Sequence, residues 1–256
     1  LEFWERSSMN NHPSLILKGI SDDALSSPIA RKVKLIANKV SISIVCEIIS
    51  IEECTRLSHL AKSLVLLVYL NNNNNVGEKD NDERNNEPIC IASSRSMLRM
   101  IATVNNAANT TNGLLGKSIV DDAIIDGWLS FIWISIELPL QTLLDDTTTM
   151  DLIDRDDIGN QIKESLSKVE RHLLTKKNKS HHHESERRER ENHHHHLYMV
   201  GVDGYTLADY SLAVSLYFML INDIVVSSIM TSEVCPQLYL WYQTISPTII
   251  DNLITK

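Results

Sequence analysis

The stretch Gly204-Tyr205-Thr206-Leu207-Ala208-Asp209 specifies the start of a helix in two ways at once. Thr206 is a favoured N-cap residue. Asp209, three positions later, can accept a hydrogen bond from the backbone N–H of Thr206, which is the pattern of a capping box. The helix that follows, 207–220, is apolar on nearly every side. We therefore predict a central helix buried inside a helical core.

Working outward from this helix, the two halves of the chain differ in periodicity. In 158–174 apolar residues recur three and four positions apart, and the apolar stretch 119–138 has the length of a helix that we expect to end at Pro139. Before the polar linker 105–112 the pattern changes to short β-branched runs, which favour strands. The predicted strands are 14–20, 42–51, 64–70 and 88–92, and the predicted helices between them begin at Pro28, near Glu52 and at Ser93 or Ser94.

Ser27 precedes Pro28 at the start of the first predicted helix. Serine is a good N-cap, and a proline in the first helical position loses no N–H that the helix needs. A strand–helix–strand start that ends in a hairpin and a helix matches a thioredoxin-like half domain. We predict an α+β protein with a thioredoxin-like domain over 13–104 and an all-helical domain over 117–256.

Two segments have a composition unlike the rest. Segment 71–87 begins with five asparagines and continues with charged and amide residues, and segment 175–196 contains seven of the ten histidines. Neither has an apolar period, so we predict that both are disordered inserts. The runs His181–His183 and His193–His196 could bind a metal, but a zinc site needs a fixed cage of ligands. We expect low-complexity expansion and no metal site.

Charge and cysteine content narrow the classes of function. The net charge of −9 argues against a general nucleic-acid-binding surface. Four scattered cysteines without a C-x-x-C pair indicate a reducing, intracellular setting. The longest apolar stretches are interrupted by charged residues or proline and fall short of a membrane span. We expect a cytoplasmic protein without membrane attachment.

Taken together, the segments resemble the glutathione-transferase superfamily, abbreviated GST. The resemblance rests on four motifs in the family's order. Ser27–Val33 is similar to S/C-P-x-x-R-K-V, and Ser93–Ala102 is similar to E-S-R-A-I-L-R-Y-I-A. Val200–Asp209 is similar to L-x-G-x-x-x-T-L-A-D, and Cys235–Ile245 is similar to P-N-L-x-R-W-Y-x-x-I. The resemblance implies that Thr206 and Asp209 belong to the signature of the fold.

One function implied by the resemblance is that of a cytosolic glutathione transferase. Ser27 would then donate a hydrogen bond to the glutathione thiolate, and Ser93 and Ser94 would bind the γ-glutamyl group at a helix N-terminus. The sequence departs from the enzymes at two places. Ser93 occupies the position of their usual glutamate, and Lys62-Ser63-Leu64-Val65 lacks their proline before the third strand.

The other implied function is that of a non-catalytic module. Met97–Ala102 and Val120–Phe131 resemble segments of the N-terminal domains of glutamyl-tRNA synthetase and of multisynthetase accessory proteins. Such modules dock one GST-like fold on another, through a sheet edge and first-helix face or through the helical half. In this chain Leu240 replaces the arginine that often precedes the late tryptophan.

The sequence therefore predicts a GST-like interaction module of the translation machinery, with a divergent glutathione transferase using Ser27 as the alternative. We expect no cofactor for the module, and glutathione for the enzyme. The expected partner is another GST-like protein of an aminoacyl-tRNA synthetase or elongation-factor complex, or a second copy of the chain. Weak tRNA contacts would come from the basic residues Lys176, Lys177, Lys179, Arg187, Arg188 and Arg190.

Overall fold

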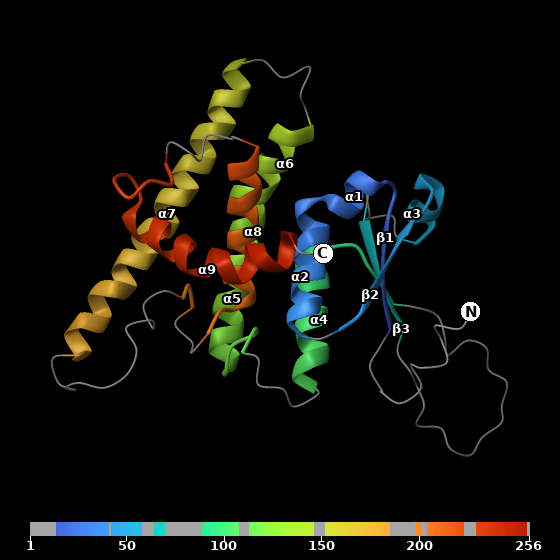
Figure 1. Cartoon of the computed structure of the whole chain (residues 1–256), viewed down its shortest axis with the longest axis horizontal. Helices are drawn as coiled ribbons and strands as arrows, with labels where there is room; N and C mark the ends of the chain where they lie inside the picture. Colours follow the sequence, from blue (N-terminus) through green and yellow to red (C-terminus); the bar gives the residue numbers. More distant parts are fainter. Residues whose placement is uncertain are drawn as a thin grey trace. The chain divides into compact units, whose positions relative to one another are not determined.

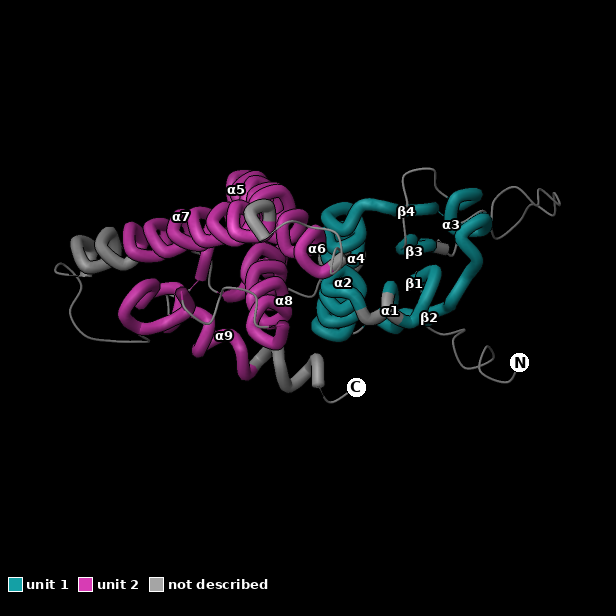
Figure 2. Tube along the Cα trace, turned by 90° about the horizontal axis from the view of Figure 1, so that it is seen from above, with its two compact units in different colours: residues 1–112 teal, residues 113–256 magenta. Residues whose placement is uncertain are grey.

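The computed structural model describes residues 14–40, 42–57, 64–69, 89–107, 113–145, 152–184, 198–200, 204–222 and 229–254. The chain divides into two compact units, Leu1–Asn112 and Gly113–Lys256 (Figure 2).

Unit 1 contains a mixed four-stranded sheet in the order β2-β1-β3-β4. β1 pairs in parallel with β2, and β3 runs antiparallel to both β1 and β4. The carboxyl ends of β1, β2 and β4 therefore lie at the same end of the sheet, where β3 begins. The strands are β1 (Ser14–Gly19), β2 (Ile44–Ile48), β3 (Leu64–Tyr69) and β4 (Ile89–Ile91).

Helices cover both faces of this sheet, because apolar residues point to both sides of the central strands. α2 and α4 pack against each other on one face, and α3 lies on the opposite face (Figure 1). Under α3 the core contains Ile49, Cys54, Val65 and Leu67. This arrangement confirms the predicted thioredoxin-like half. The helices are α1 (Asp22–Ser26), α2 (Pro28–Lys39), α3 (Ile51–Leu57) and α4 (Ser94–Ala107).

The regular elements in the described part of unit 2 are all helices. α8 packs against α5 and α9, and twelve of its residues between Leu207 and Met219 are buried. The predicted central helix is therefore present, and the fold class is the predicted one. The elements are α5 (Ile119–Ile132), the π-helical turn η2 (Trp133–Glu137), α6 (Leu138–Asp145), α7 (Leu152–Glu184), α8 (Leu207–Ile221) and α9 (Pro236–Ile254).

From the sequence we expected the helix that begins at Ile119 to end at Pro139, and this prediction was wrong. It continues through η2 into α6 and ends at Asp145. Proline lacks an N–H and its ring collides with the carbonyl four residues earlier. In the wider π-helical turn the N–H of Leu138 donates to the carbonyl of Trp133, five residues earlier. This spacing lets the chain pass Pro139 without breaking the helix.

Segment 175–196 is also not wholly a loop. α7 extends to Glu184 and so includes the first ten residues of the expected insert. Lysine, arginine and glutamate are good helix formers, and lengthening a helix that is already anchored by packing needs no new nucleus. The rest of this segment, and the whole of segment 71–87, lie outside the described residues.

Within the described residues, one helical segment, Ile119–Leu144, is long and apolar enough to cross a membrane by length and composition alone. Only 39% of its most apolar window is buried inside the structure. The segment belongs to the helical core of unit 2, so its remaining apolar residues lie on an outer face.

Candidate functional site

The topology of unit 1 brings the serines of the predicted glutathione site to the same end of the sheet. α2, which begins after Ser27, follows β1 through the short helix α1, and α4 begins after Ser93 at the end of β4. β1 and β4 run in the same direction, because both are antiparallel to β3. The helices that begin after Ser27 and Ser93 therefore both start at the end of the sheet formed by the carboxyl ends of these strands. The positions Lys62 and Ser63, where the family carries its proline, lie outside the described residues.

The hydroxyl of Ser27 already has two partners inside the protein. Its Oγ donates to the carbonyl of Ala24 at 2.7 Å and accepts from the backbone N–H of Ala30 at 3.3 Å. A hydroxyl has only one proton to donate. To stabilise a thiolate, Ser27 would have to withdraw that proton from Ala24. In this structure Ser27 therefore acts as the N-cap of α2.

Ser93 and Ser94 begin α4, where the backbone N–H of Met97 donates to the carbonyl of Ser93 at 2.9 Å. Ser93 is exposed and Ser94 is half-buried. The first turn of α4 contains no acidic residue, so the described side chains there include none to hold the γ-glutamyl amine by charge. A helix N-terminus of this kind can still receive a carboxylate.

Asp209 has the most complete set of partners among the residues singled out from the sequence. Its carboxylate is fully buried and accepts four hydrogen bonds at 2.8–3.2 Å. The donors are the N–H and hydroxyl of Thr206, the N–H of Met199 and the indole N–H of Trp241. Burial raises the pKa of Asp209, and the four donors oppose that rise. Tyr205 and Tyr210 contact each other edge to face beside it. We therefore interpret Asp209 as a residue that stabilises the fold.

Lys176 is not available as the phosphate contact that we expected. Its Nζ donates to the carbonyl of Tyr198 at 2.6 Å. Burial lowers the pKa of Lys176 to about 8, an effect that the nearby carboxylate of Asp209 partly opposes. The reason for the difference from the sequence prediction is the extension of α7, which carries this lysine into the folded part of unit 2.

The lowered pKa of Lys176 predicts a pH dependence of stability. In the unfolded chain Lys176 titrates near its ordinary pKa of 10.5, and in the folded chain it titrates near 8. Between these values the unfolded state holds more protons, so the contribution of Lys176 to stability rises as pH increases through this window. Chemical denaturation at pH 7.5, 9 and 10 should show this rise relative to Lys176→Met. A constant difference between the two proteins would contradict the assignment.

Sequence reasoning did not find the exposed apolar edge of the sheet. β2 is one of the two outer strands of the sheet, and its residues Val45 and Ile48 are 54% and 56% exposed, followed by Ile51 at 67%. An outer strand leaves backbone N–H and C=O groups open to pairing with another chain. The signal was present in the sequence as an apolar strand, but the order of the strands was needed to show that it lies at the edge.

A charged cluster lies beside this edge. Lys18 on β1 pairs with Glu53 of α3 at 3.0 Å and with Glu47 of β2 at 3.3 Å. The hydrogen bond to Glu53 is the main reason that the pKa of Lys18 is raised. Since Lys18 is shared between Glu47 and Glu53, it neutralises only part of the charge beside β2, where Val45 and Ile48 are exposed.

A second residue that the sequence did not reveal is Glu170 on α7. Its two carboxylate oxygens accept from the backbone N–H groups of Gln237 at 3.1 Å and Leu238 at 2.7 Å. These N–H groups lie in the first turn of α9, where a helix has no acceptors of its own. Glu170 therefore caps α9 from a helix nearly seventy residues earlier in the chain.

Cysteine and metal chemistry find little support in the described part of the chain. All four cysteines are free, and burial raises the pKa of the Cys54, Cys90 and Cys235 thiols, which leaves less thiolate at neutral pH. No group of three described His, Cys, Asp or Glu residues is arranged to hold a metal ion. The side chains of His181–His183 and His193–His196 lie outside the described residues.

The mixed sheet β2-β1-β3-β4 with helices on both faces, followed by a helical unit whose buried helix begins at a capping box, defines the glutathione-transferase fold. Neither a protein-family model nor a curated protein sequence matches the chain.

Solved structures match nearly the whole chain, at low identity. Ure2p in complex with glutathione has a TM-score of 0.67 at 13% identity, covering 97% of this chain and 95% of that one. The nitrogen regulation fragment of this yeast prion protein also matches. Poplar glutathione transferase F1 has a TM-score of 0.63 at 15% identity, covering 95% and 99%. Omega 2S from Trametes versicolor has a TM-score of 0.57 at 12% identity, covering 94% and 93%.

Proposed function

We propose that the chain is a non-catalytic interaction module with the glutathione-transferase fold, which docks on another GST-like protein of a cytoplasmic aminoacyl-tRNA synthetase or elongation-factor complex. The observation that carries the non-catalytic part is the Ser27 hydroxyl, whose only proton is donated to Ala24 at 2.7 Å. The translation partners are suggested by the synthetase-like segments Met97–Ala102 and Val120–Phe131.

The exposed edge of β2 supports docking in this proposal. Val45 and Ile48 are more than half exposed on an outer strand, and such strands accept a further strand or an apolar surface from a partner. Pairing there would satisfy backbone groups and cover the apolar side chains in the same step.

A capture experiment tests this proposal. The tagged chain, incubated with lysate of its source organism, is expected to enrich aminoacyl-tRNA synthetases or elongation-factor subunits. Val45→Lys should abolish that enrichment, because a lysine on an edge strand blocks strand addition. Val234→Lys is the matched control, since Val234 is a valine of similar exposure, 57%, in unit 2. Capture that enriches no such protein, or that survives Val45→Lys unchanged, would count against the proposal.

The alternative is a divergent glutathione transferase. One observation favours it: the helices that begin at Ser27 and at Ser93-Ser94 both start at the carboxyl end of the strands. Calorimetric titration with reduced glutathione separates the two proposals. Binding near 1 mM corresponds to about 4 kcal/mol and would support the enzyme. The interaction module predicts no heat of binding from a folded sample.

Ser27→Ala should lower the free energy of unfolding by about 1 kcal/mol, because the N-cap of α2 is lost. Ser27→Gly, which is a better N-cap than alanine, should lower it by only a few tenths of that amount. Urea denaturation measures both values. Under the proposed function the original chain and both variants show no glutathione-dependent turnover of 1-chloro-2,4-dinitrobenzene. A turnover in the original chain that disappears in Ser27→Ala would instead assign Ser27 to catalysis.

A further inference from the structure

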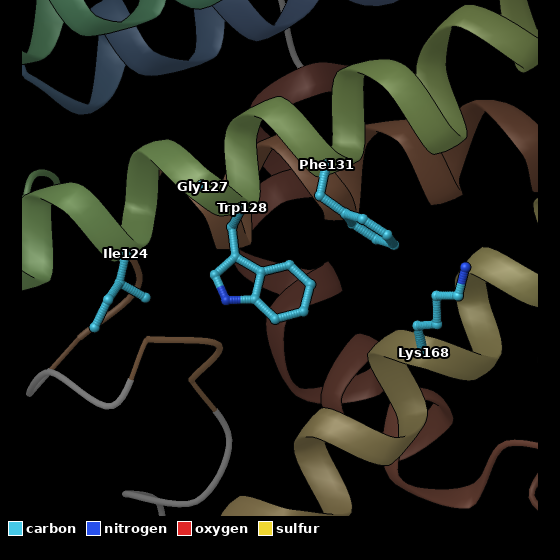
Figure 3. A pocket seen from close by; sticks show the side chains of 5 residues that line it. All are labelled: Ile124, Gly127, Trp128, Phe131 and Lys168. Carbon is cyan, nitrogen blue, oxygen red and sulfur yellow. The ribbon is translucent and has the colours of Figure 1, made fainter.

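The edge of β2 and a groove on unit 2 are both exposed and apolar, but they differ in charge. The groove has a volume of about 280 Å³ and is lined by Ile124, Gly127, Trp128, Phe131 and Lys168 (Figure 3). Lys168 pairs with Glu164 at 2.9 Å, so the charge at the rim of the groove is already balanced. Beside β2, in contrast, two carboxylates share one lysine. The edge of β2 therefore indicates the charge of its partner, and the groove does not.

One face of β2 carries both an apolar residue and a carboxylate. Val45 is in register with Ile16 of β1, and Glu47 is in register with Lys18. Residues in register on neighbouring strands point to the same face of the sheet. Ile16 packs against the core under α3, and Lys18 pairs with Glu53 of α3. Val45 and Glu47 therefore both point to the face of the sheet that α3 covers.

The other face of β2 is apolar. Ile44, Cys46 and Ile48 point to this face, because alternate residues of a strand point to the same side. Ile44 and Cys46 are in register with Leu15 and Leu17, which are fully buried in β1. Cys46 is exposed at the outer edge, and so is Ile48. A strand added beside β2 would extend this apolar face, so its residues on this side should also be apolar.

The charges beside β2 do not cancel. Lys18 donates to Glu53 at 3.0 Å and lies 3.3 Å from Glu47. The side chain of Glu47 is 43% exposed, whereas that of Lys18 is only 15% exposed. On α3 the exposed residues Glu52 and Arg56 have opposite charges. Among these described side chains the carboxylates exceed the cations by one, and Glu47 is the carboxylate that lies on the edge strand itself.

From these two faces we infer that the edge of β2 binds an antiparallel strand with a basic residue opposite Glu47. The residues opposite Val45, Ile44 and Ile48 are apolar. Opposite charges that face each other across two strands stabilise the pairing, and the antiparallel direction is the more stable one per residue. The net charge of −9 attracts such a segment before contact. This inference rests on the proposed docking at β2 and adds the chemistry of the docking segment.

Cys46 allows a direct test, because its thiol is exposed on β2. The peptides Thr-Val-Lys-Cys-Val-Val-Thr and Thr-Val-Glu-Cys-Val-Val-Thr place their cysteine opposite Cys46 and their charged residue opposite Glu47 in an antiparallel pair. Equal amounts of both compete for the folded chain in a buffer of 2-mercaptoethanol and its disulfide. Mass spectrometry after digestion at acid pH measures the ratio of the two mixed disulfides on Cys46. The urea-unfolded chain gives the ratio that holds without strand pairing.

Relative to the unfolded chain, the folded chain should prefer the lysine peptide about fivefold, and high salt should reduce this preference. Glu47→Gln should bring the ratio close to one, and Glu47→Lys should invert it. Glu164→Lys is the matched control, because it also reverses a glutamate that is paired with a lysine, and it should leave the ratio unchanged. A ratio near one in the original chain, or a preference for the glutamate peptide, would overturn the inference.

A second pair of peptides tests the direction of the added strand. In Thr-Val-Val-Cys-Lys-Val-Thr the lysine lies opposite Val45 if the strands are antiparallel. This peptide and its glutamate counterpart should therefore bind equally. A preference for lysine confined to this second pair would assign a parallel strand and overturn the inferred direction.

Capture from lysate separates this inference from the proposed function. A fivefold preference for the lysine peptide, together with capture that enriches no translation protein, would reject the proposed partners and keep the basic strand. A ratio near one, together with capture that is lost in Val45→Lys, would keep docking at β2 and reject the basic strand.

Discussion

Asp209→Ala is expected to lower the free energy of unfolding by about 3–5 kcal/mol. The substitution removes the acceptor of four hydrogen bonds in a fully buried site. The N–H groups of Thr206 and Met199 and the indole of Trp241 would then be buried without their partner. The loss exceeds that of an ordinary cap because the same carboxylate also joins α8 to α9 and to the segment before α8.

Urea denaturation followed by far-UV circular dichroism measures this effect. Asp156→Ala is the control, because Asp156 is exposed on α7 and its loss should change stability by less than about 0.5 kcal/mol. Asp209→Asn should fall between the two, since the amide keeps one acceptor oxygen but brings an N–H group toward the Thr206 donors. Equal stabilities of Asp209→Ala and Asp156→Ala would show that the buried network contributes nothing to folding.

Glu170→Ala is expected to lower the free energy of unfolding by about 2 kcal/mol. Glu170 is half-buried and accepts two charge-assisted hydrogen bonds from the first turn of α9. Its removal leaves these N–H groups without a side-chain acceptor and removes this hydrogen-bonded link between α7 and α9. Thermal denaturation at constant pH can measure the change.

Glu164→Ala supplies a matched control for Glu170, because both are glutamates of α7. Glu164 forms an exposed ion pair with Lys168, four residues later, at 2.9 Å. Such exposed pairs contribute little to stability, because water screens the two charges. A loss in Glu170→Ala no larger than that in Glu164→Ala would disprove the capping role.

The starts of helices were the features most predictable from the sequence, because a few adjacent residues determine them. Thr206 with Asp209, and Ser27 with Pro28, begin α8 and α2 at the expected positions. The strands also form where β-branched runs occur, although β2 is shorter than the run 42–51. Local propensity and local hydrogen bonding suffice for such features.

What the sequence did not reveal depends on distant residues or on strain relief. Pro139 was expected to end a helix, and only the wider turn before it shows why the helix continues. Glu170 reaches a helix start sixty-seven residues later, and no local pattern announces such a contact. At the candidate site, sequence motifs found Ser27 but could not show that its proton is already donated to Ala24.

The burial of α8 has a consequence for how slowly this part of the chain exchanges its amide hydrogens with solvent. Since residues from Leu207 to Phe218 are buried almost without interruption, water reaches these amides only when the surrounding helices separate. Exchange along α8 should therefore report the opening of unit 2 as a whole. Each 1.4 kcal/mol of unfolding free energy lost through a change at Asp209 would then raise the exchange rate along α8 about tenfold. Amide exchange in this one helix therefore measures how cooperatively unit 2 opens.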